Sequence, residues 1–477
     1  MLLRKIFAAI MMTASLASCK KVIESEPTHQ LDGSTRFTSI EDFDFALTGA
    51  YALFRSGNYY GSGSNAFVNL PDMLSDNLNE STTESLGNYQ TLSTWRYAED
   101  EPNIGATWQA AYRIISQANL LLRDIDNFSA TDGGAVNRIK SQALAIRALA
   151  HFDLLRYWVE EYDRNSTKPG IPYITVFDYE QKPARGTVKE TYDHIEADLQ
   201  QARGFINSGL DKAINATGKA YIDIQGVNAI MARVFLYSNQ LDSAIKYSTL
   251  VINSIPLASR TNFPNIWTDA STAEVIWSVS FNAGEGRIGD PVYFVPNNRS
   301  SYRPNPALVT MYDQVNDIRY SSYFQVRSSS NGNRLVLSKY LAKAAQVSRP
   351  DGITNFKAFR TGEMYLIRAE AYARKGGANE TLGLADLNTL RTARIAGFIA
   401  GTETGTALLN AIAVERRKEL ISEGHRWFDL KRTTKTIVRT SCSVFCTLDP
   451  ANRAWTWPLP IAEINANPNI LPQNPGY

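Results

Sequence analysis

Paired segments with helical periodicity are the feature that most limits what this chain can fold into. Residues 105–125 and 138–160 each carry apolar side chains at the spacing of one helix face, which predicts two neighbouring amphipathic helices. Residues 226–253 predict two more helices with a turn near Asn239, and residues 363–394 repeat this plan. Each amphipathic helix must bury its apolar face against a neighbour. The pattern therefore predicts a mainly α protein built from stacked helix pairs, similar to tetratricopeptide repeats.

Two local signals refine these helices. Gly133 and Gly134 separate the first two periodic segments, so we expect them to form the turn between those helices. Thr187 is followed three residues later by Glu190, the spacing of a capping box at the start of a helix.

Three long segments break the helical pattern. Residues 56–100, 257–350 and 433–477 are rich in Gly, Asn, Ser, Tyr or Pro, and two stretches within the second, 274–282 and 334–341, predict short strands. Long irregular loops on a rigid scaffold are where binding functions concentrate. We therefore expect ligand-binding insertions near 56–100 and 257–350.

The first residues have the pattern of a lipoprotein signal peptide. Arg4 and Lys5 precede an apolar run from residue 6 to 17, which is shorter than the about 20 residues that a membrane-spanning helix needs. Small residues then lead directly to Cys19. This pattern predicts that residues 1–18 are removed and that a lipidated Cys19 anchors a mature chain of residues 19–477 to a membrane. The alternative is an ordinary secretory signal that contains a cysteine.

Composition excludes several classes of protein. With 49 Lys+Arg against 47 Asp+Glu, the chain lacks the basic excess of a nucleic-acid-binding protein. Its histidines are scattered without metal-ligand spacing, and no Ser–His–Asp signature or nucleotide-binding loop is present, so we expect no metal, cofactor or catalytic residue. Cys442 and Cys446 either form a small-loop disulfide or remain free thiols, and we favour the disulfide.

Several longer motifs occur in an order that resembles the SusD/RagB family of outer-membrane nutrient-uptake lipoproteins. Residues 415–433 form the most specific of them. In chain order the matching stretches are SIEDFDFALTGAYALF, LPDMLSDN, TWQAAYRIISQANLLL, ALAIRALAHFDLLRYW, RGTVKETYDHIEADLQQA, FRTGEMYLIRAEAYARKG, LADLNTLRTAR, ERRKELISEGHRWFDLKRT and WPLPIAEINANPNILPQNPGY.

The resemblance implies one SusD-like domain over residues 19–477 and a role outside the outer membrane. A family member of this kind caps a SusC-like TonB-dependent transporter and delivers to it a captured glycan or, in the RagB branch, a peptide. The resemblance also implies a protein without enzymatic activity. A surface glycosidase and a structural or adhesive helical-repeat protein are the alternatives from other classes.

Three glutamates in the most specific motif have two interpretations. Glu415, Glu419 and Glu423 recur along one helix face, and such carboxylates suggest acid–base chemistry. We favour a structural network of ion pairs with arginines of neighbouring helices, such as Arg147 or Arg368. Farther along, Gly424 predicts close packing or a helix break, Trp427 and Phe428 predict core positions, and the proline-rich residues 467–477 predict an extended, hydrogen-bonded tail.

Candidate ligand contacts come from the aromatic and amide residues of the irregular segments. Sugar faces pack on aromatic rings, while amides and carboxylates bond the hydroxyl groups. The alternative for each aromatic residue is ordinary core packing. If Arg303 is close to the site, it would favour acidic sugars or peptide carboxylates. The candidates are Tyr59, Tyr60, Asp76, Asn79, Tyr89, Trp95, Tyr293, Phe294, Asn298, Tyr302 and Arg303.

Overall fold

The computed structural model describes residues 37–215, 218–329, 331–440, 442 and 444–477. The predicted signal peptide and Cys19 lie outside the described residues. Nine helices of 14 residues or more dominate the described chain. They are α3 (Ile40–Leu53), α6 (Pro102–Asp124), α7 (Ser129–Trp158), α8 (Val188–Asn207), α9 (Ile224–Tyr237), α10 (Leu241–Ser254), α14 (Thr361–Lys375), α15 (Asn379–Arg394) and α16 (Gly405–Glu419).

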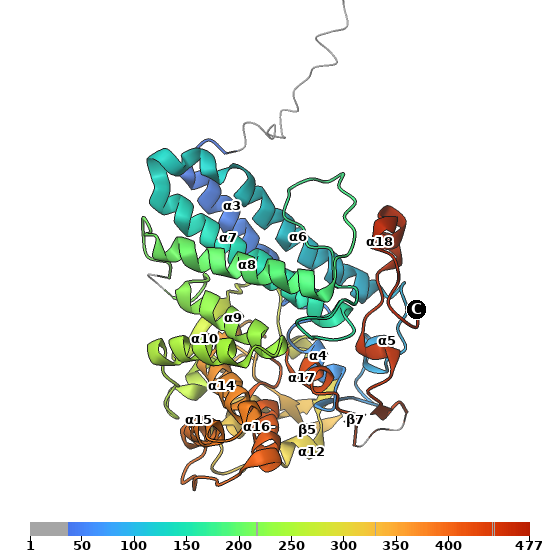
Figure 1. Cartoon of the computed structure of the whole chain (residues 1–477). Coiled ribbons are helices and arrows are strands. Elements are labelled where there is room, and N and C mark those ends of the chain that lie inside the picture. The colour runs from blue at the N-terminus through green and yellow to red at the C-terminus, as the bar shows by residue number, and fades with distance from the viewer. Residues whose placement is uncertain (1–36, 216–217, 330, 441, 443) are drawn as a thin grey trace, which may run out of the picture.

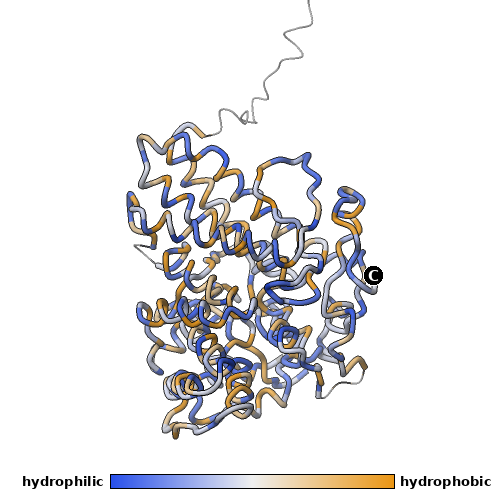
Figure 2. Tube along the Cα trace, in the orientation of Figure 1, coloured by the Kyte–Doolittle hydropathy of each residue, from blue (hydrophilic) through white to orange (hydrophobic). Residues whose placement is uncertain are grey.

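These helices pack as successive pairs, which confirms the predicted mainly α scaffold. Helices α6, α7 and α8 lie side by side, α9 packs on α10, and α14 packs on α10, α15 and α16 (Figure 1). Apolar and polar residues alternate along their turns (Figure 2). Among the described residues, no helix combines the length and the apolar character that crossing a bilayer requires.

Most predicted helix boundaries are confirmed, with one difference. Thr187 and Glu190 form the capping box of α8, and Asn239 lies between α9 and α10 with φ of 60°. Gly133 and Gly134, however, lie inside α7, directly after a kink at Asp132. A Cβ on Gly134 would lie 2.6 Å from the backbone nitrogen of Asp211, so this glycine allows a close approach of two chain segments rather than a turn.

Most of the short elements belong to the irregular segments; β6 and α17 lie outside them. Within the described residues, four two-stranded antiparallel sheets pair β1 with β3, β2 with β6, β4 with β5, and β7 with β8. The strands are β1 (Leu78–Glu80), β2 (Val275–Val279), β3 (Tyr302–Pro304), β4 (Phe324–Ser329), β5 (Gly332–Leu337), β6 (Phe356–Arg360), β7 (Ile437–Val438) and β8 (Thr447–Leu448). The short helices are α4 (Leu70–Met73), α5 (Gln90–Ser93), α11 (Phe263–Ile266), α12 (Pro306–Val309), α13 (Ile318–Tyr323), α17 (Arg426–Arg432) and α18 (Ile461–Ala466).

The C-terminal segment packs against the end of α7. The ring of Tyr157 stacks on that of Trp457 with centroids 3.7 Å apart, and the Asn474 side-chain amide donates to the carbonyls of Trp158 and Trp457. The predicted hydrogen-bonded tail is therefore present. Residues 468–470 differ from the extended prediction because they form a 3-10 turn that the Asn467 side chain caps, and residues 475–476 form a second turn.

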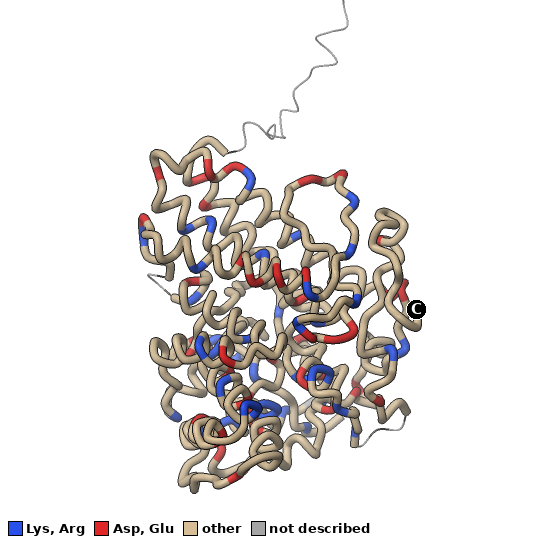
Figure 3. Tube along the Cα trace, in the orientation of Figure 1, with Lys and Arg blue, Asp and Glu red and all other residues tan. Residues whose placement is uncertain are grey.

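A buried network of opposite charges, here called the charge cluster, lies where α16 ends. It joins Glu274, Glu419 and Glu423 to Arg319, Arg360 and Arg394. The Glu419 carboxylate lies 2.9 Å from nitrogens of both Arg360 and Arg394, and 3.1 Å from Arg319. Lys and Arg lie beside Asp and Glu throughout this region (Figure 3).

The charge cluster confirms that the motif glutamates are structural, but the two arginines suggested as partners were wrong. Arg147 pairs with Asp198 and Arg368 with Asp386, each on neighbouring helices. Burial alone would raise the pKa of Glu419, yet the guanidinium groups of Arg394, Arg360 and Arg319 hold it well below its usual range.

The other predictions for this motif are also confirmed. Trp427 and Phe428 have no exposed surface. Gly424 has φ of 79°, and a Cβ there would lie 2.1 Å from the carbonyl oxygen of Phe67, so no other residue fits without a backbone shift.

Candidate functional site

The two irregular segments that carry most ligand candidates meet in space. Strand β1 pairs with β3, which places Asn79 opposite Arg303 and Glu80 opposite Tyr302. The segments 56–100 and 285–305, far apart in sequence, therefore form one surface through this small sheet.

A cavity of about 410 Å³ opens beside the sheet, here called the loop cavity. Its walls come from β1, α5, Tyr302 of β3, and the chain that follows β7. The lining residues are Met73, Leu78, Asn79, Glu80, Ser81, Thr82, Ser85, Gly87, Gln90, Ser93, Thr94, Tyr302, Arg439, Cys442 and Val444.

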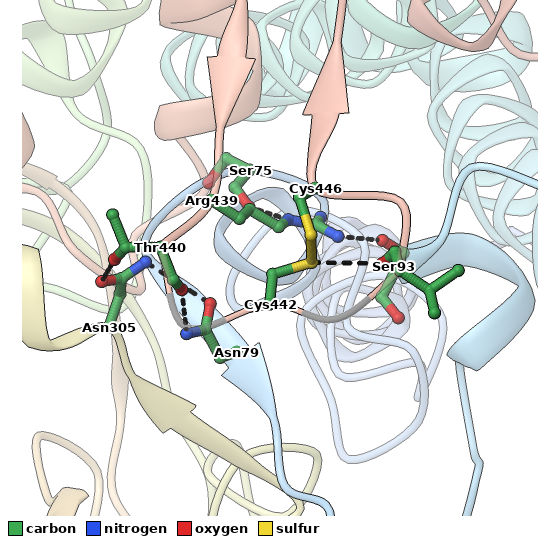
Figure 4. The surroundings of a disulfide bond; sticks show 9 residues. Ser75, Asn79, Ser93, Asn305, Arg439, Thr440, Cys442 and Cys446 are labelled. Carbon is green, nitrogen blue, oxygen red and sulfur yellow. Dashed lines mark hydrogen bonds between the residues drawn. A yellow bond between two sulfur atoms is a disulfide. The ribbon is translucent and has the colours of Figure 1, made fainter.

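One wall of the loop cavity is a short loop closed by a disulfide. Cys442 and Cys446 are bonded with an S–S distance of 2.20 Å, which confirms the predicted pairing (Figure 4). The bond closes the connection between β7 and β8, and two loop residues, Cys442 and Val444, reach the cavity.

Arg439 anchors this loop to the rest of the site. Its guanidinium donates to the carbonyls of Ser75 at 2.8 Å and Ser93 at 2.6 Å (Figure 4), and to those of Met73 and Leu74 at 2.9 Å. Burial lowers the pKa of Arg439 to about 10, so the side chain keeps its charge at neutral pH. Because carbonyls occupy its donors, Arg439 acts on the position of the loop.

Hydrogen-bonding groups line the remaining cavity wall. The Asn79 amide donates to the carbonyl of Thr440 at 2.9 Å, which links β1 to the residue before the disulfide loop. The Glu80 carboxylate accepts from Ser85 at 2.5 Å and from Gln90 at 3.3 Å. Glu80 is half-buried and Gln90 is exposed, so both keep capacity for further hydrogen bonds.

Exposed apolar side chains at or next to lining residues of the loop cavity were missed by sequence reasoning. Phe445 is 44% exposed, and the Arg96 guanidinium lies 5.1 Å from its ring centroid. Val444 and Leu86 are exposed as well, at 61% and 63%. An aromatic residue inside a disulfide-closed loop is the sequence signal that points to Phe445 as a ligand contact. The prediction for Cys442 and Cys446 covers only the disulfide.

Several predicted aromatic platforms are core residues, and their assignment is corrected. Tyr59, Tyr60 and Tyr293 are at most 2% exposed, so no ring face is open to a ligand. The Tyr59 hydroxyl donates to Asp153 at 2.5 Å, and the Tyr60 ring stacks on Phe54. A tyrosine close to asparagine and glycine in the sequence therefore does not show whether its ring packs in the core or binds a ligand.

Trp95 and Tyr302 are also largely buried, and of the two only Tyr302 lines the loop cavity. The Trp95 indole donates to the carbonyl of Leu74, and the Arg439 guanidinium lies 4.0 Å from its ring centroid. The Tyr302 hydroxyl donates to Ser93 at 3.2 Å, and burial raises its pKa well above 10. Tyr302 therefore forms part of the cavity wall, and Trp95 supports the lining residue Arg439.

Two charged candidates are taken up by ion pairs. Both carboxylate oxygens of Asp76 face Arg426, at 2.8 and 2.9 Å, and Arg417 is 3.2 Å away. Burial would raise the pKa of Asp76, but these guanidinium groups lower it. Arg303 lies 3.4 Å from Glu84. Because its charge is paired with this carboxylate, Arg303 does not favour acidic ligands as predicted.

The remaining candidates lie outside the cavity lining. Tyr89 precedes α5 in a left-handed conformation and is half-buried. Phe294 is half-buried and Asn298 is exposed, with its amide oxygen accepting from the Tyr293 hydroxyl at 2.8 Å. Of the eleven predicted contacts, only Asn79 and Tyr302 line the loop cavity.

Comparisons with known proteins agree with this architecture. A family model described as "Starch-binding associating with outer membrane" matches residues 30–236, and a model described as "SusD family" matches residues 308–477. The SusD-like protein P2 of Formosa agariphila is 25% identical, over 98% of this chain and 98% of that protein.

Solved structures show the same fold. A SusD superfamily protein of Bacteroides thetaiotaomicron is 25% identical and superposes with a TM-score of 0.81, over 92% of this chain and 100% of that chain. A SusD-like carbohydrate binding protein of Bacteroides vulgatus is 22% identical with a TM-score of 0.77, over 91% and 98%. With its two family models covering the N-terminal and C-terminal parts in turn, this chain belongs to the SusD/RagB family.

Proposed function

We propose that this protein is a cell-surface lipoprotein that captures an oligosaccharide in the loop cavity and passes it to a SusC-like TonB-dependent transporter. The observation that carries the proposal is the cavity itself, which amide, hydroxyl and carboxylate groups line together with Val444, the chain neighbour of the exposed Phe445. This combination matches a sugar ring, which has an apolar face and a polar edge. The family assignment and the relative described as carbohydrate binding support the same ligand class.

The charges around the cavity favour a neutral sugar. Arg439 is engaged by backbone carbonyls and Arg303 by Glu84, so neither guanidinium is free to pair with a ligand carboxylate. Glu80 also disfavours an anionic ligand by repulsion. We therefore expect neutral oligosaccharides to bind more tightly than acidic ones.

The cavity chemistry supports binding without hydrolysis. Glycoside hydrolysis generally needs two carboxylic acids that flank the scissile bond. Among the described residues that line the loop cavity, Glu80 is the only carboxylic acid. The nearby Asp76 and Glu84 are held in ion pairs with arginines.

Anchoring and delivery belong to the same proposal. A lipidated Cys19 would hold the protein on the outer membrane, facing the cell exterior, and Cys19→Ala should release it or leave it unprocessed. If the variant still fractionates with the outer membrane, lipidation is not the anchor. Co-purification of the transporter with the wild-type protein from membranes checks the partner.

The ligand is tested with a panel of neutral and acidic oligosaccharides and short peptides, measured by isothermal titration calorimetry. We expect a neutral oligosaccharide to bind, and Asn79→Ala with Gln90→Ala to weaken that binding about tenfold through lost hydrogen bonds. Tight binding of peptides alone would favour a RagB-like function instead. Release of smaller sugars from a labelled oligosaccharide would contradict a purely binding role.

A further inference from the structure

A second cavity of about 510 Å³ lies between α6, residues 172–183 and α18, here called the α18 cavity. It has no lining residue in common with the loop cavity. Its lining residues are Trp108, Tyr112, Ile115, Ser116, Pro172, Ile174, Val176, Asp178, Tyr179, Glu180, Gln181, Lys182, Pro183, Glu463, Ala466, Asn467 and Ile470.

Hydrogen bonds hold the walls of the α18 cavity at both ends. On the α6 side, the Tyr112 hydroxyl donates to the carbonyl of Pro172 at 2.7 Å. On the C-terminal side, the amides of Asn467 and Asn469 donate to the carbonyls of Pro183 and Lys182, each at 2.8 Å. The cavity is thus a formed part of the fold, in which the C-terminal segment contributes one wall.

The cavity has a buried apolar floor and exposed apolar side chains at its mouth. Trp108, Tyr112 and Ile115 follow one face of α6; Trp108, Ile115 and Ile470 are buried, and Tyr112 is half-buried. At the mouth, Val176 is 59% exposed and Tyr179 is 82% exposed. Large exposed apolar side chains beside a cavity are the usual sign of a surface that a ligand covers.

The charged groups of the cavity are mainly acidic. Asp178, Glu180 and Glu463 line it against a single cation, Lys182. Glu463 is half-buried, and within the described residues it has no ion pair. Burial raises its pKa, while the nearby indole N–H of Trp108 lowers it. A carboxylate in partly apolar surroundings loses hydration, which an arriving cation would replace.

We propose that the α18 cavity is a second ligand site, which takes an aromatic or apolar group that carries a positive charge. The ring would pack between Tyr112 and Tyr179, where the aromatic faces also attract the cation, and the charge would pair with Glu463. This site goes beyond the proposed sugar capture and stands independently of it, because the two cavities have separate walls.

Three probes with one ring separate the contributions of the ring and the charge. Tryptamine carries an ammonium group, indole is neutral, and indole-3-acetate carries a carboxylate. Calorimetry with the full protein should give the order tryptamine, then indole, with indole-3-acetate weakest. Glu463→Gln should weaken tryptamine binding about tenfold, by removal of a charge-assisted contact, and leave indole unchanged. Ala466→Phe, which fills the cavity, should abolish binding of all three.

A matched control removes an exposed carboxylate outside the cavity. Asp100 lies in the turn before α6, and the Asp100→Asn variant should leave tryptamine binding unchanged. Equal affinities for tryptamine and indole, or an equal loss in Asp100→Asn and Glu463→Gln, would overturn the assignment of the charge. Absence of binding by every probe at millimolar concentration would overturn the site itself. The three indole probes test the α18 cavity, whereas the oligosaccharide titrations test the loop cavity. None of these outcomes therefore depends on the proposed sugar site.

Discussion

The charge cluster and the loop cavity both gather charged and polar side chains, but they leave those groups in opposite states. In the charge cluster, Glu419 and Arg360 have no exposed surface, and each charge faces an opposite charge within about 3 Å. In the loop cavity, Glu80 and Gln90 face open volume and keep capacity for new hydrogen bonds. A satisfied network holds the fold, whereas a partly satisfied one can bind a ligand.

The two regions are also physically joined. Arg426 and Arg417, which belong to the same motif as Glu419, pair with Asp76 just before β1. The amide of Ser422 donates to Asp72, whose pKa burial raises to about 7. The family motif therefore positions the segment that carries the cavity wall, although none of its residues lines the loop cavity. Substitutions that change stability without changing affinity, or the reverse, test whether the charge cluster is structural and the loop cavity binds the ligand.

The largest expected effect comes from Glu419→Gln. Removal of one carboxylate leaves the buried charge cluster with one excess positive charge, although Arg319, Arg360 and Arg394 keep other carboxylate partners, and breaking a buried pair typically costs about 3–5 kcal/mol. Urea denaturation should reveal this loss in the free energy of unfolding, while the affinity of the folded protein for its oligosaccharide stays unchanged. Asp193→Asn, at an exposed carboxylate that pairs with Lys189 and Arg164, should cost less than about 1 kcal/mol. A selective loss of affinity in Glu419→Gln would break the distinction between the two regions.

Opening the disulfide should affect both properties. Replacing Cys442 and Cys446 by serine frees a five-residue loop, which costs about 2 kcal/mol on the chain-entropy model. Because Cys442 and Val444 line the cavity, the oligosaccharide affinity should fall several-fold. Calorimetry and thermal melting of the double variant check the two effects. An unchanged affinity would mean that the loop is only a structural closure.

Acid should lower the stability of the helical framework, because His151 is buried there in its neutral form. His151 accepts from the amide of Ile174 at 3.0 Å, and burial holds its pKa well below 6.5. The unfolded chain therefore binds a proton below about pH 6.5 that the folded chain does not, and stability falls as the pH falls. The slope is about 1.4 kcal/mol per pH unit.

The comparison of variant and wild type isolates this histidine. Asp72, with its raised pKa, makes stability fall as pH rises over the same range, and His425, whose pKa burial also lowers, acts in the same direction as His151, so the total slope mixes these groups. His151→Gln should remove about 1 kcal/mol from the change in stability between pH 6.5 and 5.5, where the unfolded histidine is only partly protonated. Urea denaturation at both pH values measures it, and an identical slope in the variant would rule out this histidine as the source.

The smallest expected effect concerns the exposed ring of Phe445, which follows the cavity-lining Val444. Phe445→Ala should weaken oligosaccharide binding by about 1 kcal/mol, close to fivefold, and leave stability unchanged. Phe445→Trp should retain or strengthen binding. Tyr179→Ala removes an exposed ring at the other cavity and serves as the control. Equal affinities in Phe445→Ala and wild type would leave the sugar without this platform.

Sequence periodicity predicted the scaffold well because burial of an amphipathic face is a local pattern. The capping box at Thr187, the turn at Asn239 and the core positions of Trp427 and Phe428 all follow from it. The disulfide was predictable from cysteine spacing and the expected oxidising location. Arg147 and Arg368 were wrong as partners of the motif glutamates, because the choice among many arginines depends on which helices touch.

The candidate site was less predictable for a physical reason. Tyr59 and Asn79 lie in similar sequence surroundings, yet one is a core residue and the other lines the cavity. Burial of a loop aromatic depends on contacts with segments hundreds of residues away, as the pairing of β1 with β3 illustrates. Composition identified two of the segments that line the loop cavity but not the disulfide loop, and the three-dimensional pairing decided which side chains reach it.

Hydrogen–deuterium exchange with and without a bound neutral oligosaccharide tests most directly whether the loop cavity is the binding site. Ligand should slow exchange in peptides that span residues 78–94 and 437–448, which form the cavity walls. Peptides from α14 to α16, around the charge cluster, should be unaffected. Protection confined to the charge cluster or to residues 172–183, with none in 78–94 and 437–448, would contradict the assignment of sugar binding to the loop cavity.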